Sequence, residues 1–243
     1  MGKRIIPQRR GKGSSTYRSP SHRHLAAPGY PKSQETVGEV VDLHHAPGRT
    51  APLAEVRFDN NEKQFLLANN GLRVGQEIEV GPKATIEKGN VLPLLKIPVG
   101  TFVYNLELEP LDGGKLVKTA GSHATIISQE RRTTTLRLPS DKFKRVDNRC
   151  RATIGIVAGG GHKEQSFAKA GKVVHSASSK AKRPKKVRGI AMNAINHPHG
   201  GGDHQHVGVP SKVSANAPPG RKVGNLSSKK TKKKKKKEEK LRR

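Results

Sequence analysis

The sequence predicts a mostly β protein, with two consecutive small β-barrels between extended, basic N- and C-terminal arms. Short alternating or β-branched runs recur at roughly ten-residue spacing through the middle of the chain, separated by Gly, Asn and Pro. Positive charge gathers at the two ends: residues 1–34 hold eight Lys and Arg and no acid, residues 35–170 have a net charge of +3, and residues 171–243 have +18. Only the nearly neutral middle therefore looks able to bury a core.

The first barrel is predicted over residues 36–83. The run VGEVVDL (Val37–Leu43) is rich in β-branched residues, as strands are. The run LAEVRF alternates, which places Ala54, Val56 and Phe58 on one face of a strand. KQFLLA and VGQEIEVG predict two more strands, the second with Ile and Val alternating with Glu, and a Gly-Pro pair then marks the end of the barrel.

The second barrel is predicted over residues 84–166. The prolines in NVLPLLKIPVG exclude a long helix. TFVYNLELE is expected to form one strand with Phe102, Tyr104, Leu106 and Leu108 on the same face. HATIIS, TTTLRLP, FKRV and RATIGIVAGGG continue the series of strands. Little helix is expected anywhere in the chain.

The flanking segments are predicted to be irregular. Residues 1–35 form a basic N-terminal arm of Arg, Lys, Gly, Ser and Pro. Residues 167–228 form an extended C-terminal segment in which regular structure should fade, and residues 229–243 form a Lys-rich tail.

The charge predicts a polyanionic partner. The 48 Lys and Arg against 19 Asp and Glu give a formal charge of +29, which a self-contained domain has no reason to carry. No apolar run approaches the roughly 20 residues of a membrane span, and the first residues lack the apolar core of a secretory signal, so no membrane partner is expected. A single cysteine, Cys150, excludes an internal disulfide and is expected to be partly buried in a reducing compartment.

Two small β-barrels with basic arms suit RNA as the polyanionic partner, and composition constrains how the chain would recognise it. Aromatic residues make up 3% of the chain and Trp is absent, so paired rings that stack single-stranded bases are not evident. Recognition is expected to depend on phosphates, backbone shape and pockets in folded RNA.

The segment VRGIAMNAINHPHGGGDHQHVG (187–208) has no helical or strand periodicity and is expected to be a loop ordered by a partner. Its four histidines, His197, His199, His204 and His206, are of a type that binds zinc, but they flank a flexible glycine run. We therefore expect no metal, no cofactor and no catalytic residue, and imidazoles that hydrogen-bond RNA instead. The alternative is a metal-dependent or hydrolytic RNA-processing enzyme that uses the His197–His206 cluster, although no GxSxG motif is present.

Several motifs resemble the family of ribosomal large-subunit protein two, the universal "L-two" family, over nearly the whole length. These motifs are PGRTAPLAEVRF, NVLPL, IPVGT, LPS, CRATIGIVAGGG, KAGK, VRGIAMN and HPHGGG, and the HQH and GRKVG runs resemble the archaeal and eukaryotic form. The resemblance implies an oligonucleotide-binding-type barrel, then an SH3-like barrel, then a C-terminal segment embedded in rRNA near the peptidyl transferase region. It also implies a cytoplasmic role in subunit assembly and association. The implied partners are large-subunit rRNA, other large-subunit proteins and, through an intersubunit contact, the small subunit.

The chain departs from the family pattern at two positions. Ala194 and Asn196 stand where the pattern has Pro and an acid. Without that acid, His197 lacks a neighbour that could orient or charge it for proton transfer, which weakens any catalytic reading. The residues predicted to bind RNA are Arg4, Arg9, Arg10, Lys12, Arg18, Arg49, Arg151, Lys180, Lys182, Arg183, Lys185, Lys186, Arg188, Met192, Asn193, His197, His199, Gly200, Gly201, Gly202, His204, His206, Arg221 and Lys222.

Overall fold

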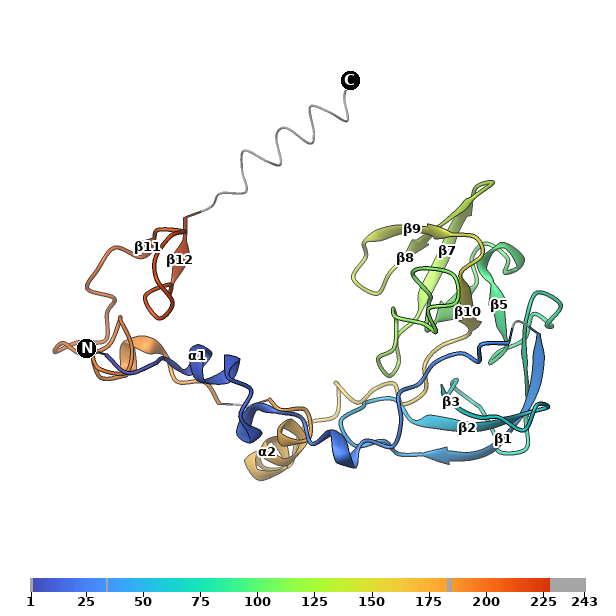
Figure 1. Ribbon diagram of the computed structural model, residues 1–243, viewed down its shortest axis with the longest axis horizontal. Coiled ribbons are helices and arrows are strands. Elements are labelled where there is room, and N and C mark those ends of the chain that lie inside the picture. The colour runs from blue at the N-terminus through green and yellow to red at the C-terminus, as the bar shows by residue number, and fades with distance from the viewer. Residues whose placement is uncertain (1, 34, 183–184, 228–243) are drawn as a thin grey trace, which may run out of the picture. The chain divides into compact units, whose positions relative to one another are not determined.

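The computed structural model describes residues 2–33, 35–182 and 185–227, so the predicted Lys-rich tail lies outside the described residues (Figure 1). Strands predominate, and the predicted mostly β class is confirmed. The strands are β1 (Thr36–His44), β2 (Leu53–Phe58), β3 (Lys63–Leu67), β4 (Glu77–Val80), β5 (Val91–Pro93), β6 (Phe102–Tyr104), β7 (Ala124–Gln129), β8 (Thr133–Arg137), β9 (Phe143–Asp147), β10 (Arg151–Ile154), β11 (Lys212–Val213) and β12 (Asn225–Leu226). The helices are α1 (Ile6–Gly11) and α2 (Ala170–Ser178), with 3-10 turns at Ser15–Tyr17, Ser21–Arg23, Leu94–Lys96 and Gly189–Ala191.

The described chain divides into two compact units. Residues 20–172 form the first, which we call the β unit. Residues 2–19 and the described residues from 173 to 227 form the second, which we call the terminal unit. The sequence predicted separate N- and C-terminal arms, whereas the structure groups most of their described residues together. The predicted domain boundaries stay predictions.

One hydrogen-bonded ladder connects both halves of the β unit. Its strand order is β3-β2-β1-β4-β5-β10-β6-β7-β8-β9. Neighbouring strands are antiparallel except β4 and β5, which meet in parallel at Val80 and Val91. One hydrophobic cluster is built mainly from β1–β4, with Val91 of β5, and a second from β5–β10. A third cluster, around Leu53, Tyr104 and Val157, contains residues of both halves. Where two consecutive barrels were predicted, the structure has two hydrophobic cores whose strands belong to one continuous ladder.

The predicted alternation of β2 is confirmed. Ala54, Val56 and Phe58 are buried, while Arg57 between them is exposed. In β4, Ile78 is buried in the same core. Alternation identifies the strand correctly because one face packs on the core and the other meets solvent.

The long strand predicted over TFVYNLELE is wrong. Strand β6 ends at Tyr104, because Asn105 takes a left-handed conformation with φ of 50° that turns the chain out of the ladder. Val103 and Tyr104 are buried, whereas Phe102 is 45% exposed. The apolar face of this segment therefore changes along its length.

The predicted loss of regular structure after Phe167 is wrong for α2. The segment contains no proline, and Val173 and Ala177, one turn apart, are its partly buried apolar residues. The hydroxyl of Ser19 donates to the carbonyl oxygen of Ser179 at 3.0 Å, which ties the N-terminal chain to the end of this helix. None of the helices in the described part of the chain is long and apolar enough to cross a membrane.

Candidate nucleic-acid interface

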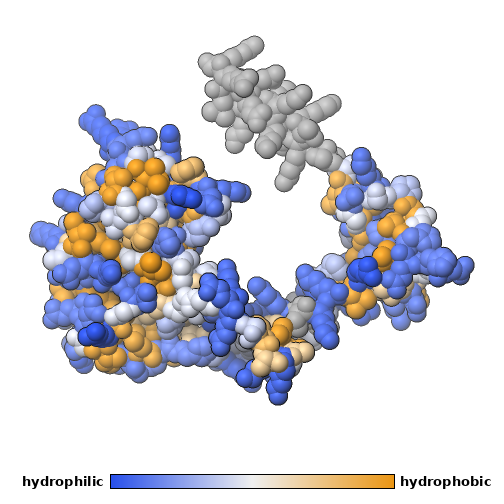
Figure 2. All heavy atoms as spheres, turned by 180° about the vertical axis from the view of Figure 1, so that it is seen from behind, coloured by the Kyte–Doolittle hydropathy of each residue, from blue (hydrophilic) through white to orange (hydrophobic). Residues whose placement is uncertain are grey.

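Positive charge in the terminal unit is not neutralised by carboxylates. Nine ion-pair contacts occur among the described residues, and all nine lie between Glu35 and Arg151, in the β unit. The described part of the terminal unit contains one acidic residue, Asp203. Hydrophilic side chains cover most of the face of this unit that Figure 2 shows. Exposed cations without counter-charges attract a polyanion and release its counterions on binding.

Most of the residues predicted to bind RNA are accessible to a large ligand. The exposed ones are Arg4, Arg9, Arg10, Lys12, Arg18, Lys182, Lys185, Lys186, Arg188, Asn193, Gly201, Gly202, His204, His206, Arg221 and Lys222. Arg49, Lys180, Met192, His197, His199 and Gly200 are partly buried. Arg183 lies outside the described residues. RNA contact by these residues stays a prediction.

The structure contradicts the predicted RNA contact of Arg151. Its side chain is 6% exposed and its guanidinium donates to Glu107 at 2.9 and 3.1 Å. The remaining terminal nitrogen donates to the carbonyl oxygen of Pro31 at 2.9 Å. All three guanidinium nitrogens therefore donate hydrogen bonds inside the fold. Arg49 is partly used in the same way, because it donates to the carbonyl oxygen of Ala26 at 3.1 Å.

Backbone hydrogen bonds shape the histidine-rich segment. The amide of Gly200 donates to the carbonyl oxygen of His197 at 2.9 Å, and the amide of Gly201 donates to that of Met192 at 2.9 Å. Apart from the 3-10 turn at Gly189–Ala191, residues 187–208 contain no helix or strand, as predicted. The result is a closed loop over residues 187–208, which we call the histidine loop, and His197 in it is partly buried.

His197 is held as a neutral imidazole. Its Nδ1 atom accepts a hydrogen bond from the amide of His199 at 3.0 Å, so the neutral ring carries its proton on Nε2. Burial lowers the pKa of His197, and the neighbouring His199 lowers it further. The two rings lie edge to face with centroids 5.2 Å apart. At neutral pH this side chain can donate from Nε2 to a phosphate or base oxygen.

We expect NMR titration of the His197 ring in the free protein to give a midpoint below the usual 6.5. Because the folded loop favours the neutral ring, its contribution to loop stability is complete above pH 6.5 and is lost as the pH falls below it. Gly189 lies against the imidazole, where a Cβ would overlap the ring atoms. Gly189→Ala should displace the ring and move its pKa back toward 6.5; a wild-type midpoint at or above 6.5 would contradict the expectation.

A cavity of about 380 Å³ brings together residues from distant parts of the sequence. Arg4, His197 and Arg221, all predicted to bind RNA, contribute to its lining. The amide of Lys3 donates to the carbonyl oxygen of Ile195 at 2.7 Å, which fixes the N-terminal chain against the loop. The N-terminal cations and the histidine loop therefore belong to one surface.

The histidines do not converge on a common point. His204 and His206 are exposed, and the described residues include no group of three or more His, Cys, Asp or Glu side chains placed to hold a metal ion.

Phe102 and His123 form a ring pair that the sequence did not predict. Phe102 at the start of β6 and His123 just before β7 have ring centroids 4.4 Å apart and are tilted by 47°. Composition predicts few such pairs but cannot show which rings are exposed and adjacent. The expectation that the chain has no evident paired rings for stacking single-stranded bases stays a prediction.

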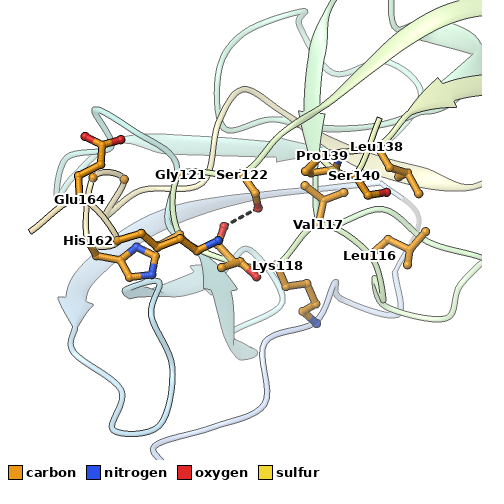
Figure 3. Close-up of a pocket in the computed structure, with 15 residues that line it drawn as sticks. Leu116, Val117, Lys118, Gly121, Ser122, Leu138, Pro139, Ser140, His162 and Glu164 are labelled. Carbon is orange, nitrogen blue, oxygen red and sulfur yellow. Dashed lines mark hydrogen bonds between the residues drawn. The ribbon is translucent and has the colours of Figure 1, made fainter. Parts of the chain in front are cut away.

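A pocket of about 550 Å³ opens in the second half of the β unit. Figure 3 shows Val117, Leu138 and Pro139 on one side of it and His162 and Glu164 on the other. Lys118 also lines the pocket, but its ammonium group donates to the carbonyl oxygens of Pro28 and Gly114, and burial lowers its pKa. Besides Lys163, the lining includes Glu164, whose carboxylate opposes the binding of a phosphate.

Comparison with known proteins assigns the chain to a family. The family of "Ribosomal Proteins L2, RNA binding N-terminal domain" matches residues 6–80, and that of "Ribosomal Proteins L2, C-terminal domain" matches residues 87–234. The chain belongs to the L2 family of ribosomal proteins. The first match covers β1–β4 and the second covers β5–β12, so the two family domains correspond to the two strand groups and the C-terminal segment.

Similar proteins are archaeal members of this L2 family. The large ribosomal subunit protein uL2 of a Methanococcus maripaludis strain is 52% identical over 237 residues, which cover 95% of this chain and 99% of that protein. The protein of the same name from Methanothermobacter thermautotrophicus is 48% identical over 238 residues, 95% of this chain and 98% of that protein. The archaeal-type resemblance is confirmed, and so is the prediction that the chain is not an enzyme, because these relatives are ribosomal proteins.

Proposed function

We propose that the chain is a structural, RNA-binding constituent of the large ribosomal subunit in the cytoplasm. The observation that carries this proposal is the terminal unit, whose exposed Lys and Arg form no ion pair among the described residues. Family membership supports it, because the matched N-terminal family domain is described as RNA binding. The chain would bind rRNA near the peptidyl transferase region and support subunit assembly and subunit association.

The terminal unit would act by filling space between RNA helices. Lys and Arg would neutralise phosphates, and the neutral His197 would donate a hydrogen bond to an RNA oxygen. Gly202 leaves room for the RNA backbone to approach closely, whereas Gly200 allows the loop to pack against the carbonyl oxygens of Met192 and Asn193. Other large-subunit proteins and the small subunit would be its further partners.

The alternative enzyme reading is not favoured. An acid–base pair at His197 would need a carboxylate beside it, and this chain has Asn196 at the adjacent position. The one nearby acid in the sequence, Asp203, forms no ion pair with this ring among the described residues, and the Nδ1 atom of His197 already accepts from the His199 amide.

Site-specific photocrosslinking tests the proposed function. A photoreactive amino acid at Met192, in the histidine loop, is expected to crosslink to large-subunit rRNA when the tagged chain is incorporated into subunits. The matched control carries the same group at Val74, which is exposed on the β unit, and should give no crosslink to the same rRNA positions. Crosslinks from Met192 to protein alone, or failure of the chain to sediment with large subunits, would contradict the proposal.

A further inference from the structure

A second pocket, of about 410 Å³, lies beside Phe102 at the junction of the two strand groups. Its lining combines an aromatic ring, two asparagines and one lysine. The lining residues are Asn69, Asn70, Lys88, Gly100, Thr101, Phe102, Ile154, Gly155 and Ile156. No Asp or Glu is among them.

The ring of Phe102 is presented rather than buried. It is 45% exposed, and His123 packs behind it at a centroid distance of 4.4 Å. The Nδ1 atom of His123 is buried and has no hydrogen-bond partner among the described residues, so the imidazole serves here as a flat packing surface. A ring supported on one side and open to a pocket is the arrangement on which a planar ligand can stack.

Backbone hydrogen bonds fix the walls of this pocket. The amide of Asn70 donates to the carbonyl oxygen of Ile156 at 2.9 Å, and the amide of Gly89, next to Lys88, donates to that of Ile154 at 3.0 Å. The amide of Gly155 donates to the carbonyl oxygen of Phe102 at 2.8 Å. The three segments that supply the ring, the amides and the cation are therefore held in place before any ligand binds.

Gly155 lets the Asn69 side chain pack tightly into one wall of the pocket. Its φ is 119°, and a Cβ at this position would overlap the side chain of Asn69. The Oδ1 atom of Asn69 accepts from the amide of Ile156 at 3.3 Å, which orients this side chain. Only glycine therefore allows this close packing of the Asn69 amide.

We propose that this pocket takes one unpaired RNA nucleotide, with its base stacked on Phe102. The exposed Asn70 amide lies where it can meet the polar edge of a base, and Lys88 can meet its phosphate. Asn69 is 5% exposed and shapes the wall behind them. The absence of carboxylates in the lining distinguishes this pocket from the one in Figure 3, which includes Glu164. The inference rests on the proposed function, because the RNA must first be brought to the chain by the terminal unit.

The test uses the full chain, a large-subunit rRNA fragment and a single-stranded RNA of about ten nucleotides, within the usual site size. Phe102→Leu should weaken binding of the single strand about tenfold, because base stacking on an aromatic ring is lost. Phe102→Tyr should bind like the wild type. The matched control is Phe143→Leu on β9, a ring that is 66% exposed but does not line this pocket, and it should leave affinity unchanged.

Two further measurements separate stacking from charge. Phe102→Leu should leave the slope of log affinity against log salt unchanged, whereas Lys88→Gln should reduce its magnitude by about 0.7. In the rRNA complex, one base protected from dimethyl sulfate by the wild type should become reactive in Phe102→Leu. If Phe102→Leu unfolds at a lower temperature than the wild type, the decisive variant is Lys88→Gln, because Lys88 is exposed at the rim of the pocket.

The outcomes distinguish this inference from the proposed function. A wild-type chain that binds no rRNA overturns both. A wild-type chain that binds rRNA while Phe102→Leu and Lys88→Gln behave like it overturns the nucleotide pocket alone. Equal losses of affinity for the single strand in Phe102→Leu and Phe143→Leu also overturn it. The same holds if Phe102→Leu leaves every base of the rRNA complex as protected from dimethyl sulfate as in the wild type.

Discussion

Replacing Glu107 by Gln is expected to lower the free energy of unfolding by about 3–5 kcal/mol, because it leaves Arg151 as a buried charge without its counter-charge. The side chains of Glu107 and Arg151 are 0% and 6% exposed. Each carboxylate oxygen of Glu107 accepts more than one hydrogen bond. Oε1 accepts from the guanidinium of Arg151 and the amide of Gly113, and Oε2 accepts from the amides of Arg151 and Leu111. A Gln amide would turn its own N–H groups toward some of these donors, so the isosteric change still breaks the network.

The effect should extend beyond the ion pair. Arg151 also donates to the carbonyl oxygen of Pro31, and its guanidinium carbon lies 5.2 Å from the centroid of the Tyr30 ring. The Tyr30 hydroxyl in turn donates to the carbonyl oxygen of Asn105 at 2.7 Å. The chain entering β1 is therefore anchored to the second strand group through Arg151, and Glu107→Gln should loosen this anchor.

Urea unfolding measures the loss, and the chain offers a matched control. Asp141→Asn removes the exposed ion pair of Arg137 and Asp141, which are 55% and 77% exposed, and should cost less than about 1 kcal/mol. Burial raises the pKa of the Cys150 thiol to about 12, so the single thiol should react with a thiol reagent only after unfolding. Similar losses of unfolding free energy in Glu107→Gln and Asp141→Asn would show that the buried ion pair stabilises the fold no more than the exposed one.

Local pattern predicted the strands where it coincides with burial. In β2, Ala54, Val56 and Phe58 are buried on one face as the alternation predicts, and the strand has the bounds expected from LAEVRF, although Leu53 on the other face is buried too. The same pattern misled at Phe102, because the left-handed turn at Asn105 depends on tertiary packing rather than on alternation. The α2 helix was missed because the segment around it is basic and is interrupted by Pro184 further along the chain, although Ala170–Ser178 itself contains no proline.

The sequence predicted the region of the candidate interface better than the individual residues that belong to it. The excess of Lys and Arg at the termini identified the terminal unit, because an acid-poor segment has no internal partners for its cations. Composition could not separate Arg151 from the exposed arginines, because its partner Glu107 lies 44 residues away. For the same reason it could not place Phe102 beside His123, or Lys3 beside Ile195.

The affinity of the full chain for a large-subunit rRNA fragment is expected to fall about 10³-fold or more between 50 and 200 mM salt, as for a protein that neutralises roughly six or more phosphates. The described terminal unit supplies the cations for this without competing carboxylates, since its exposed Lys and Arg make no ion pair among the described residues. Filter binding or fluorescence anisotropy across a salt series measures the slope. A nearly flat dependence would contradict an electrostatic interface.

Two triple variants with the same change in net charge show where that interface lies. The first replaces Arg4, Lys185 and Lys186, which are exposed and unpaired within the described chain, by Gln. The second replaces Arg57, Lys63 and Lys83, which are also exposed but form ion pairs with Glu39, Glu55 and Glu35. If phosphates contact the terminal unit, the first variant loses about two to three units of slope and the second loses little, because its cations already have counter-charges. Equal changes would mean that net charge alone, rather than the unpaired cations of the terminal unit, drives binding.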